Sequence, residues 1–135
     1  MPSVIGIDHI VLRVSDLERS RRFYGRVLGY LGFALEWEFG VTLGWDNGVT
    51  MVWIVEADEE GKRHPHRTGN IGFHHYAFRL GAREDVDGLH KLLKKMKARV
   101  VDPPEDYPHY GPGYYAVFFL DPDGMKLEGV HFPKE

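Results

Sequence analysis

The sequence predicts an α+β fold made of two tandem βαβββ modules, and three observations support this prediction. Residues 7–14 (IDHIVLRV) resemble residues 73–80 (FHHYAFRL), so that His9 in the first segment corresponds to His75 in the second. Each segment alternates in the period of a half-buried strand, and a helical pattern follows each one. Short strand patterns joined by tight turns come after each helical pattern. The chain therefore reads as a duplicated unit.

The first half supplies the elements of one module. Ser15 and Glu18, three residues later, form a capping-box pattern, so we expect a helix that begins at Ser15 and ends near Gly29. Asn47-Gly48 is a hairpin signal between the last two strands. The three strands of this half are expected at residues 33–38, 41–45 and 49–56.

The second half repeats this order. A helix is expected from about Arg83 to Ala98, with acidic residues at its start and lysines at its end, as the helix dipole prefers. Asp123-Gly124 occupies the turn equivalent to the first hairpin signal, and the proline-rich residues 102–113 are interpreted as an ordered loop. The three strands of this half are expected at residues 99–101, 114–120 and 125–132.

Length and composition fit a single domain of ordinary globular type. The chain has 135 residues and a mass of 15.5 kDa, with 43% hydrophobic and 27% charged residues. Within this domain we place module one at about residues 4–57, a charged linker at about 58–70 and module two at about 71–132.

Several classes of partner and compartment are excluded or disfavoured. The net charge of -3 disfavours nucleic-acid binding, and no apolar stretch reaches the roughly 20 residues of a membrane span. The absence of cysteine excludes disulfides, thiolate metal ligands and cysteine nucleophiles. The first residues carry no pattern of a secretory signal, so we expect a cytoplasmic protein whose partner is a small-molecule substrate.

Strand alternation places three candidate metal ligands on one side of the sheets. His9 and His75 point away from the face that meets the helix, and Glu128 in the last strand does the same. If the two modules pair their sheets, these side chains converge as a facial triad of the kind that binds iron, zinc, nickel or manganese. Taken alone, each has a structural alternative, because single strand histidines are usually hydrogen-bonded core or surface residues. The repeat favours the metal site.

Motifs along the whole chain resemble those of one protein superfamily. They are Asp8-His9-Ile10, residues 14–20 (VSDLERS), Phe23-Tyr24, residues 74–78 (HHYAF) and residues 119–128 (FLDPDGMKLE). With them the chain resembles the vicinal oxygen chelate superfamily, also called glyoxalase/bleomycin-resistance/dioxygenase proteins. The resemblance implies a curved, open eight-stranded mixed sheet around a metal-centred cavity. It also implies one divalent metal ion per chain on His9, His75 and Glu128, with Fe(II) or Mn(II) favoured over Zn(II) or Ni(II).

Members of this superfamily act on different substrates, and the residues favour an extradiol-type ring-cleaving dioxygenase. Aligning the two hairpin turns makes Val52 equivalent to Glu128, and valine cannot serve as the fourth ligand found in glyoxalase I. Three protein ligands leave room for two substrate oxygens and dioxygen, as in the extradiol enzymes. His109 lies where those enzymes carry a further histidine that does not bind the metal, and we predict that it is the catalytic acid–base. They usually carry tyrosine at the position of Phe118.

Two alternatives remain. The chain is similar to fosfomycin-resistance thiol transferases in length, ligands and the residue 121–128 motif, although their potassium-binding loop is not recognisable. Other lyases or isomerases of the superfamily belong with this alternative. The second is a metal-free binding protein that resembles the bleomycin-resistance proteins, which the three ligands disfavour.

The remaining predictions concern substrate contacts and assembly. Arg13 and Arg79 share the face of the histidines, so each can bind an anionic substrate group or pair with a carboxylate. We expect a homodimer, because open sheets expose edges that are usually covered. The aromatic candidates for the substrate cavity are Trp37, Trp45, Tyr114 and Phe118.

Overall fold

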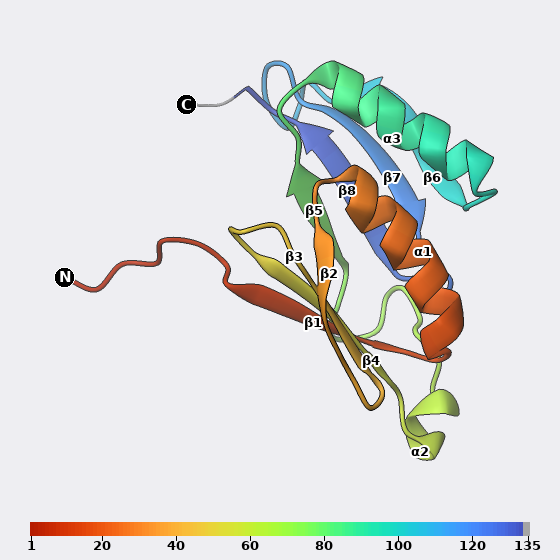
Figure 1. Cartoon of the computed structure of the whole chain (residues 1–135). Helices are drawn as coiled ribbons and strands as arrows, with labels where there is room; N and C mark the ends of the chain where they lie inside the picture. The colour runs from red at the N-terminus through yellow and green to blue at the C-terminus, as the bar shows by residue number, and fades with distance from the viewer. Residues whose placement is uncertain (134–135) are drawn as a thin grey trace. The chain divides into compact units, whose positions relative to one another are not determined.

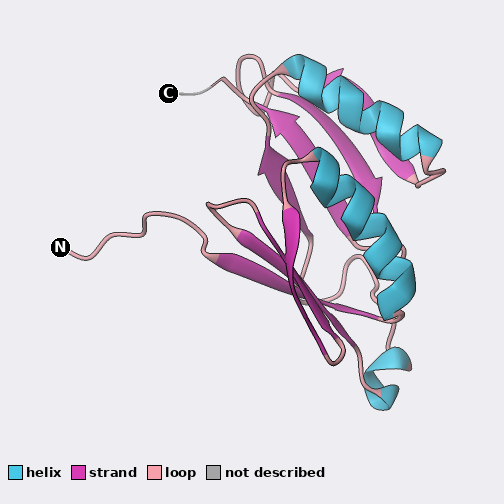
Figure 2. Ribbon diagram, in the orientation of Figure 1, coloured by secondary structure: helices cyan, strands magenta, loops and turns pink. Residues whose placement is uncertain are grey.

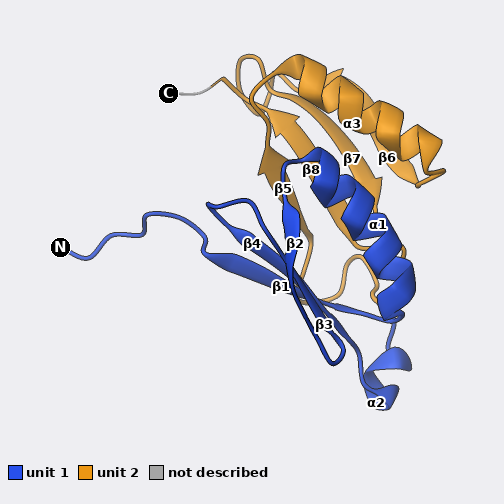
Figure 3. Ribbon diagram, in the orientation of Figure 1, with its two compact units in different colours: residues 1–65 blue, residues 66–135 orange. Residues whose placement is uncertain are grey.

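The structure, a computed structural model, describes residues 1–133 and divides the chain into two compact units, residues 1–65 and 66–135 (Figures 1 and 3). Each unit contains one four-stranded mixed sheet and one long helix (Figure 2). The predicted α+β fold with two βαβββ modules is therefore confirmed.

The first unit has the strand order β1-β4-β3-β2, in which β1 runs parallel to β4 and the other neighbours are antiparallel. Its elements are β1 (His9–Val14), α1 (Leu17–Tyr30), β2 (Ala34–Phe39), β3 (Thr42–Asp46), β4 (Met51–Glu56) and a short helix α2 (Glu59–Lys62).

The second unit repeats this topology, with the order β5-β8-β7-β6 and a parallel β5–β8 pair. Its elements are β5 (His75–Arg79), α3 (Arg83–Lys95), β6 (Val100–Asp106), β7 (Tyr115–Leu120) and β8 (Lys126–His131). No helix within residues 1–133 is long and apolar enough to cross a membrane.

Each sheet buries one face under its own helix, as the strand alternation predicts. In the first unit Leu12 and Val14 are buried while the intervening Arg13 is exposed. In the second unit α3 buries Leu89 so close to β8 that a Cβ atom on Gly129 would lie 2.6 Å from its Cδ2 atom. The opposite face of each sheet is left for functional side chains.

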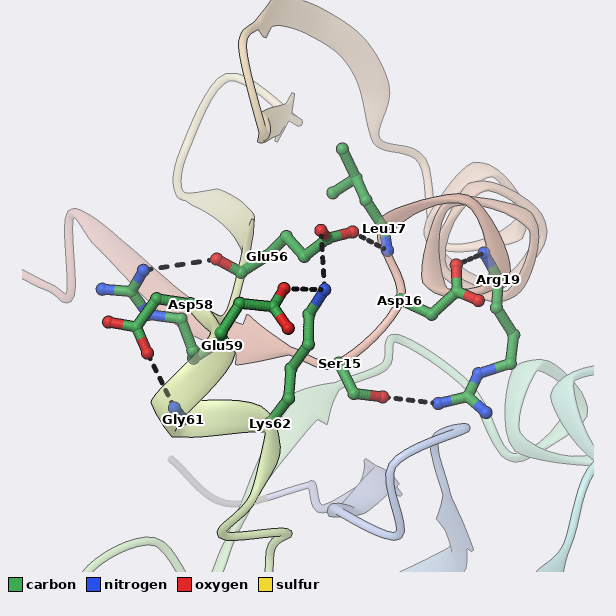
Figure 4. Close-up of polar contacts among 10 residues, drawn as sticks. Ser15, Asp16, Leu17, Arg19, Glu56, Asp58, Glu59, Gly61 and Lys62 are labelled. Carbon is green, nitrogen blue, oxygen red and sulfur yellow. Dashed lines mark hydrogen bonds and ion pairs between the residues drawn. The ribbon is translucent and has the colours of Figure 1, made fainter.

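Helix ends differ from the prediction by a few residues. The N-cap of α1 is Asp16, whose carboxylate accepts a hydrogen bond of 3.0 Å from the main chain of Arg19, whereas Ser15 accepts from the Arg19 guanidinium (Figure 4). Aspartate caps helices as well as serine does, and the observed N-cap lies one residue after the predicted one. Helix α3 ends at Lys95 because Lys97 adopts a left-handed φ of 58°.

The stretch predicted as a linker contains helix α2, capped at its start by the side chain of Asp58 (Figure 4). Lys62, at the end of α2, lies 3.2 Å from one carboxylate oxygen of Glu56. The other oxygen of Glu56 accepts a hydrogen bond of 2.9 Å from the main-chain N–H of Leu17. One carboxylate at the end of β4 thus ties α2 to the start of α1.

Strand β6 is longer than predicted. It continues through Pro103 and Pro104 to Asp106, where the sequence favoured a loop. Proline is tolerated because β6 is an edge strand, and its pairing with β7 is interrupted by register shifts. The loop proper therefore begins at Tyr107.

Candidate functional site

The open face of the second unit's sheet carries a buried carboxylate. Glu128 on β8 stands in register between Ala77 on β5 and Phe118 on β7, and only 2% of it is exposed. One carboxylate oxygen, Oε1, lies 3.2 Å from Nε2 of His75. The other, Oε2, accepts a hydrogen bond of 2.5 Å from the hydroxyl of Tyr114. The predicted ligands His75 and Glu128 are therefore neighbours.

This carboxylate lacks a permanent cationic partner. Among residues 1–133, neither a lysine nor an arginine forms an ion pair with Glu128, and its partners are Tyr114 and His75. A buried carboxylate is costly unless a positive charge or several donors compensate it. An imidazole nitrogen and a carboxylate oxygen side by side are donors that divalent metal ions accept. The pair fits the metal that the sequence predicts.

Both candidate histidines have Nδ1 engaged by the preceding residue. In His9 this atom lies 2.7 Å from a carboxylate oxygen of Asp8, and in His75 it lies 2.6 Å from Nδ1 of His74. Histidine ligands commonly bind metal through one nitrogen while the other is hydrogen-bonded to a neighbour. Nε2 is therefore the ring nitrogen that His9 can offer to a ligand, and in His75 it is the nitrogen that faces Glu128. Sequence reasoning missed the roles of Asp8 and His74, although they occupy equivalent places in the repeat.

The predicted triad is divided between the units. His9 belongs to the first unit, whereas His75 and Glu128 belong to the second. Within either unit, over residues 1–133, no three histidine, aspartate or glutamate side chains gather as a metal-binding group. The complete triad accordingly stays a prediction.

Aromatic side chains enclose the carboxylate in the second unit. Phe118 is 6% exposed, and its ring centre lies 6.0 Å from that of His75 and 4.7 Å from the ammonium nitrogen of Lys126. Burial first, and then the hydrogen bond to Glu128, raise the pKa of Tyr114 far above its usual value. Tyr114 is therefore a neutral hydroxyl donor at neutral pH.

The predicted catalytic residue, His109, lies in the turn that follows β6. Its side chain is exposed, and its ring packs on Tyr110 with the centres 4.2 Å apart. Tyr107 contacts both His109 and Phe118, with ring centres 6.1 and 5.7 Å away. The loop is thus packed against the wall around Glu128, and the catalytic role of His109 stays a prediction.

The two predicted anion-binding arginines lie on the open faces of their sheets. Arg13 donates a hydrogen bond of 3.4 Å to the main-chain oxygen of Glu56, and Arg79 donates one of 3.0 Å to the main-chain oxygen of Phe132. Both of these contacts are made to main-chain carbonyl groups.

The open face of the first unit's sheet forms a cavity of about 430 Å³ with a mainly apolar lining. The predicted residue Trp37 is half exposed and stacks on Trp53, with ring centres 6.4 Å apart. The prediction that Trp45 lines the substrate cavity is wrong, because Trp45 is buried at 3% exposure on the face that meets the helix. The lining residues are Asp8, His9, Val11, Phe39, Thr42, Met51, Trp53 and Val55.

The position equivalent to Glu128 is Trp53, and the sequence alignment that gave Val52 was wrong. Trp53 pairs with Val11 as Glu128 pairs with Ala77, whereas Val52 is fully buried toward the helix. The connection between β7 and β8 is one residue longer than that between β3 and β4, which shifts the alignment. Tryptophan cannot supply a fourth ligand either.

Comparisons with known proteins agree on one family. The family profile described as "Glyoxalase/Bleomycin resistance protein/Dioxygenase superfamily" matches residues 6–128. An uncharacterized protein of Bacillus subtilis (strain 168), YqjT, is 35% identical over 124 residues, which cover 90% of this chain and 95% of that protein. Glutathione transferase FosA of Serratia marcescens is 30% identical over 123 residues, covering 90% and 77%.

Solved structures show the same fold. A putative glyoxalase from Bacillus halodurans superimposes with a TM-score of 0.82 at 27% identity and covers 93% of this chain and 95% of its own. Lactoylglutathione lyase from Agrobacterium tumefaciens superimposes with a TM-score of 0.71 at 21% identity, covering 96% of both chains. At that identity, the second likeness concerns the fold alone.

Proposed function

The chain belongs to the Glyoxalase/Bleomycin resistance protein/Dioxygenase superfamily, and from this premise we propose that it is a divalent-metal-dependent enzyme. His9, His75 and Glu128 hold the metal, with Fe(II) or Mn(II) favoured. The observation that carries the proposal is Glu128 itself, a buried carboxylate beside an imidazole nitrogen and without a lysine or arginine partner among residues 1–133. A bound cation would compensate the cost of burying this carboxylate.

The bound metal supplies Lewis-acid polarisation of two neighbouring substrate oxygens. The residues of the chain bind and orient the substrate and exclude water. Phe118 shields Glu128 from solvent, and Arg13 and Arg79 attract an anionic group on the substrate. His109 moves a proton at the substrate oxygen, since an imidazole can both accept and donate a proton.

The first candidate reaction is cleavage of an aromatic ring that carries adjacent hydroxyl groups. The support is the cavity beside His9, where Trp53 and Phe39 offer apolar ring surfaces with centres 6.3 Å apart. Among the described residues that line it, none is a lysine or an arginine, so the cavity suits the uncharged ring of the substrate, and an anionic group of the substrate would lie outside it. Three protein ligands also leave positions for the two oxygens of such a ring.

The second candidate is transfer of a thiol to a small electrophile. It is favoured by the 30% identity with glutathione transferase FosA of Serratia marcescens. The two candidates need the same metal ligands and differ in the second reactant, which is dioxygen in one and a thiol such as glutathione in the other.

Metal stoichiometry after reconstitution tests the proposal. We expect one Mn(II) per chain by elemental analysis after gel filtration, and none in His75→Ala or Glu128→Gln. His64→Ala is the matched control, because His64 is an exposed histidine paired with Glu60 outside the candidate site. Full metal occupancy in His75→Ala would contradict the ligand assignment, and a wild-type protein without metal would favour the metal-free binder.

Substrate assays then separate the two reactions. Oxygen uptake with a panel of catechols supports ring cleavage, whereas metal-dependent loss of glutathione thiol with small epoxides supports the transferase. A loaded protein that does neither would contradict both candidate reactions.

A further inference from the structure

We propose that Tyr114 is a positioning residue for the metal ligand Glu128. Its hydroxyl holds Oε2, so that Oε1 is the oxygen presented beside Nε2 of His75. This inference rests on the proposed metal site and adds a residue that acts through Glu128 rather than through the substrate.

The contacts of the carboxylate distinguish its two oxygens. Oε2 is occupied by the Tyr114 hydroxyl at 2.5 Å, whereas Oε1 faces His75 at the longer distance of 3.2 Å. The terminal torsion of a glutamate side chain is broad, so a free carboxylate can rotate and exchange its oxygens. A short hydrogen bond to one oxygen removes that freedom. The other oxygen is then fixed next to the imidazole.

The chemistry of the donor suits a carboxylate that must bind a cation. A phenol hydroxyl is neutral, so it orients Glu128 without cancelling its negative charge. A lysine or arginine at this place would form an ion pair and compete with the metal. Outer hydrogen bonds of this kind commonly fix the orientation of metal-ligating side chains.

The loop before β7 holds Tyr114 in place. Its main-chain oxygen accepts a hydrogen bond of 2.8 Å from Tyr107, and its ring packs against Tyr110 and Phe132 with centres 5.2 and 5.0 Å away. Gly111 permits this packing, because its φ is 148° and a Cβ atom there would lie 2.5 Å from the Phe132 ring. The hydroxyl is therefore delivered by a well-packed side chain.

The test compares Tyr114→Phe with Tyr115→Phe. Both variants lose one hydroxyl and keep the ring, but the Tyr115 hydroxyl donates to Asp87, which is outside the candidate site. The Kd for Mn(II) is measured without substrate by competition with a fluorescent chelator. We expect Tyr114→Phe to bind Mn(II) about 10–100-fold more weakly and Tyr115→Phe to match wild type.

A spectroscopic readout separates positioning from a loss of stability. With Co(II) in place of Mn(II), the visible d–d bands report the ligand geometry, and we expect them to shift in Tyr114→Phe and not in Tyr115→Phe. Wild-type affinity together with an unchanged Co(II) spectrum in Tyr114→Phe would overturn this inference and leave the metal site standing. Failure of the wild type to bind either metal would overturn the proposed function as well.

Discussion

Replacing Glu128 by glutamine is expected to stabilise the metal-free protein while abolishing metal binding. Glutamine keeps the shape of the side chain and removes the negative charge of Glu128, a residue that is only 2% exposed. The hydroxyl of Tyr114 can still donate to the amide oxygen, so the hydrogen bond of 2.5 Å has a substitute. The variant therefore relieves the cost of a buried charge without creating a cavity.

The magnitude follows from the partners of Glu128. Both oxygens of Glu128 have a hydrogen-bond partner, so the cost that Glu128→Gln removes is that of a buried charge without a lysine or arginine beside it. We expect the variant to gain about 1–3 kcal/mol of stability in the absence of metal. For a chain of this length, 1 kcal/mol raises the melting temperature by about 4 °C. At a metal concentration 100 times the Kd, the wild type gains about 2.7 kcal/mol, whereas the variant gains nothing.

Thermal unfolding is followed by circular dichroism in EDTA and in excess Mn(II). It measures the stability that the variant gains without metal and the stability that the wild type gains from metal binding. The variant should melt above the wild type in EDTA, and the difference should vanish or reverse with Mn(II). Glu36→Gln, at an exposed position of β2, is the control and should melt like the wild type in both buffers. A Glu128→Gln protein that melts below the wild type in EDTA would refute the reasoning, because the protein itself would then compensate the charge.

Four further predictions address packing, catalysis and assembly. Ser20→Ala should stabilise the protein by about 1 kcal/mol in denaturant unfolding, since the fully buried Ser20 hydroxyl has no hydrogen-bond partner within residues 1–133; a loss of stability would contradict this. Gly44→Ala should destabilise the protein by about 1–3 kcal/mol and alter its tryptophan fluorescence, because the added Cβ atom would lie 2.7 Å from the Trp53 ring; an unchanged stability and fluorescence would contradict this prediction. His109→Ala should lower the turnover rate about 10²–10⁴-fold at matched metal occupancy, and a loss below about threefold would assign His109 to the loop alone. Light scattering should give twice the chain mass of 15.5 kDa, and a monomer at micromolar concentration would exclude the expected homodimer.

Strand periodicity made the faces of the sheets predictable. Because side chains alternate strictly along a strand, the sequence placed His75 and Glu128 on the side away from the helix, and the structure brings them within 3.2 Å. The same rule placed His9 on the side away from the helix, and His9 lines the cavity on the open face of the first sheet. Local signals were less exact at helix ends, where Asp16 and Ser15 are equally suitable caps and small contacts decide between them.

Features that depend on strand register and on tertiary packing could not be predicted from the sequence. The equivalence of Trp53 and Glu128 follows from strand pairing, and a turn longer by one residue was enough to suggest Val52 instead. The hydrogen bond from Tyr114 to Glu128 depends on how the loop after β6 folds back on the sheet. Strand β6 also extends through its prolines, because an edge strand has a neighbour on one side only and its outward main-chain positions need no N–H group for pairing.

The two modules use the same backbone position for opposite purposes. In the first, Trp53 lies across the bare surface of Gly44, its neighbour on β3, and builds the apolar wall of the cavity beside His9. In the second, the bulky residue is Phe118 on β7, and its neighbour on β8 is Glu128. A large aromatic side chain therefore faces a small partner in one sheet and covers a charged one in the other. In the second sheet, Phe118 keeps water from the Glu128 carboxylate and so strengthens its attraction for a cation. In the first sheet, Trp53 lies flat over Gly44 and leaves room for a planar apolar ligand.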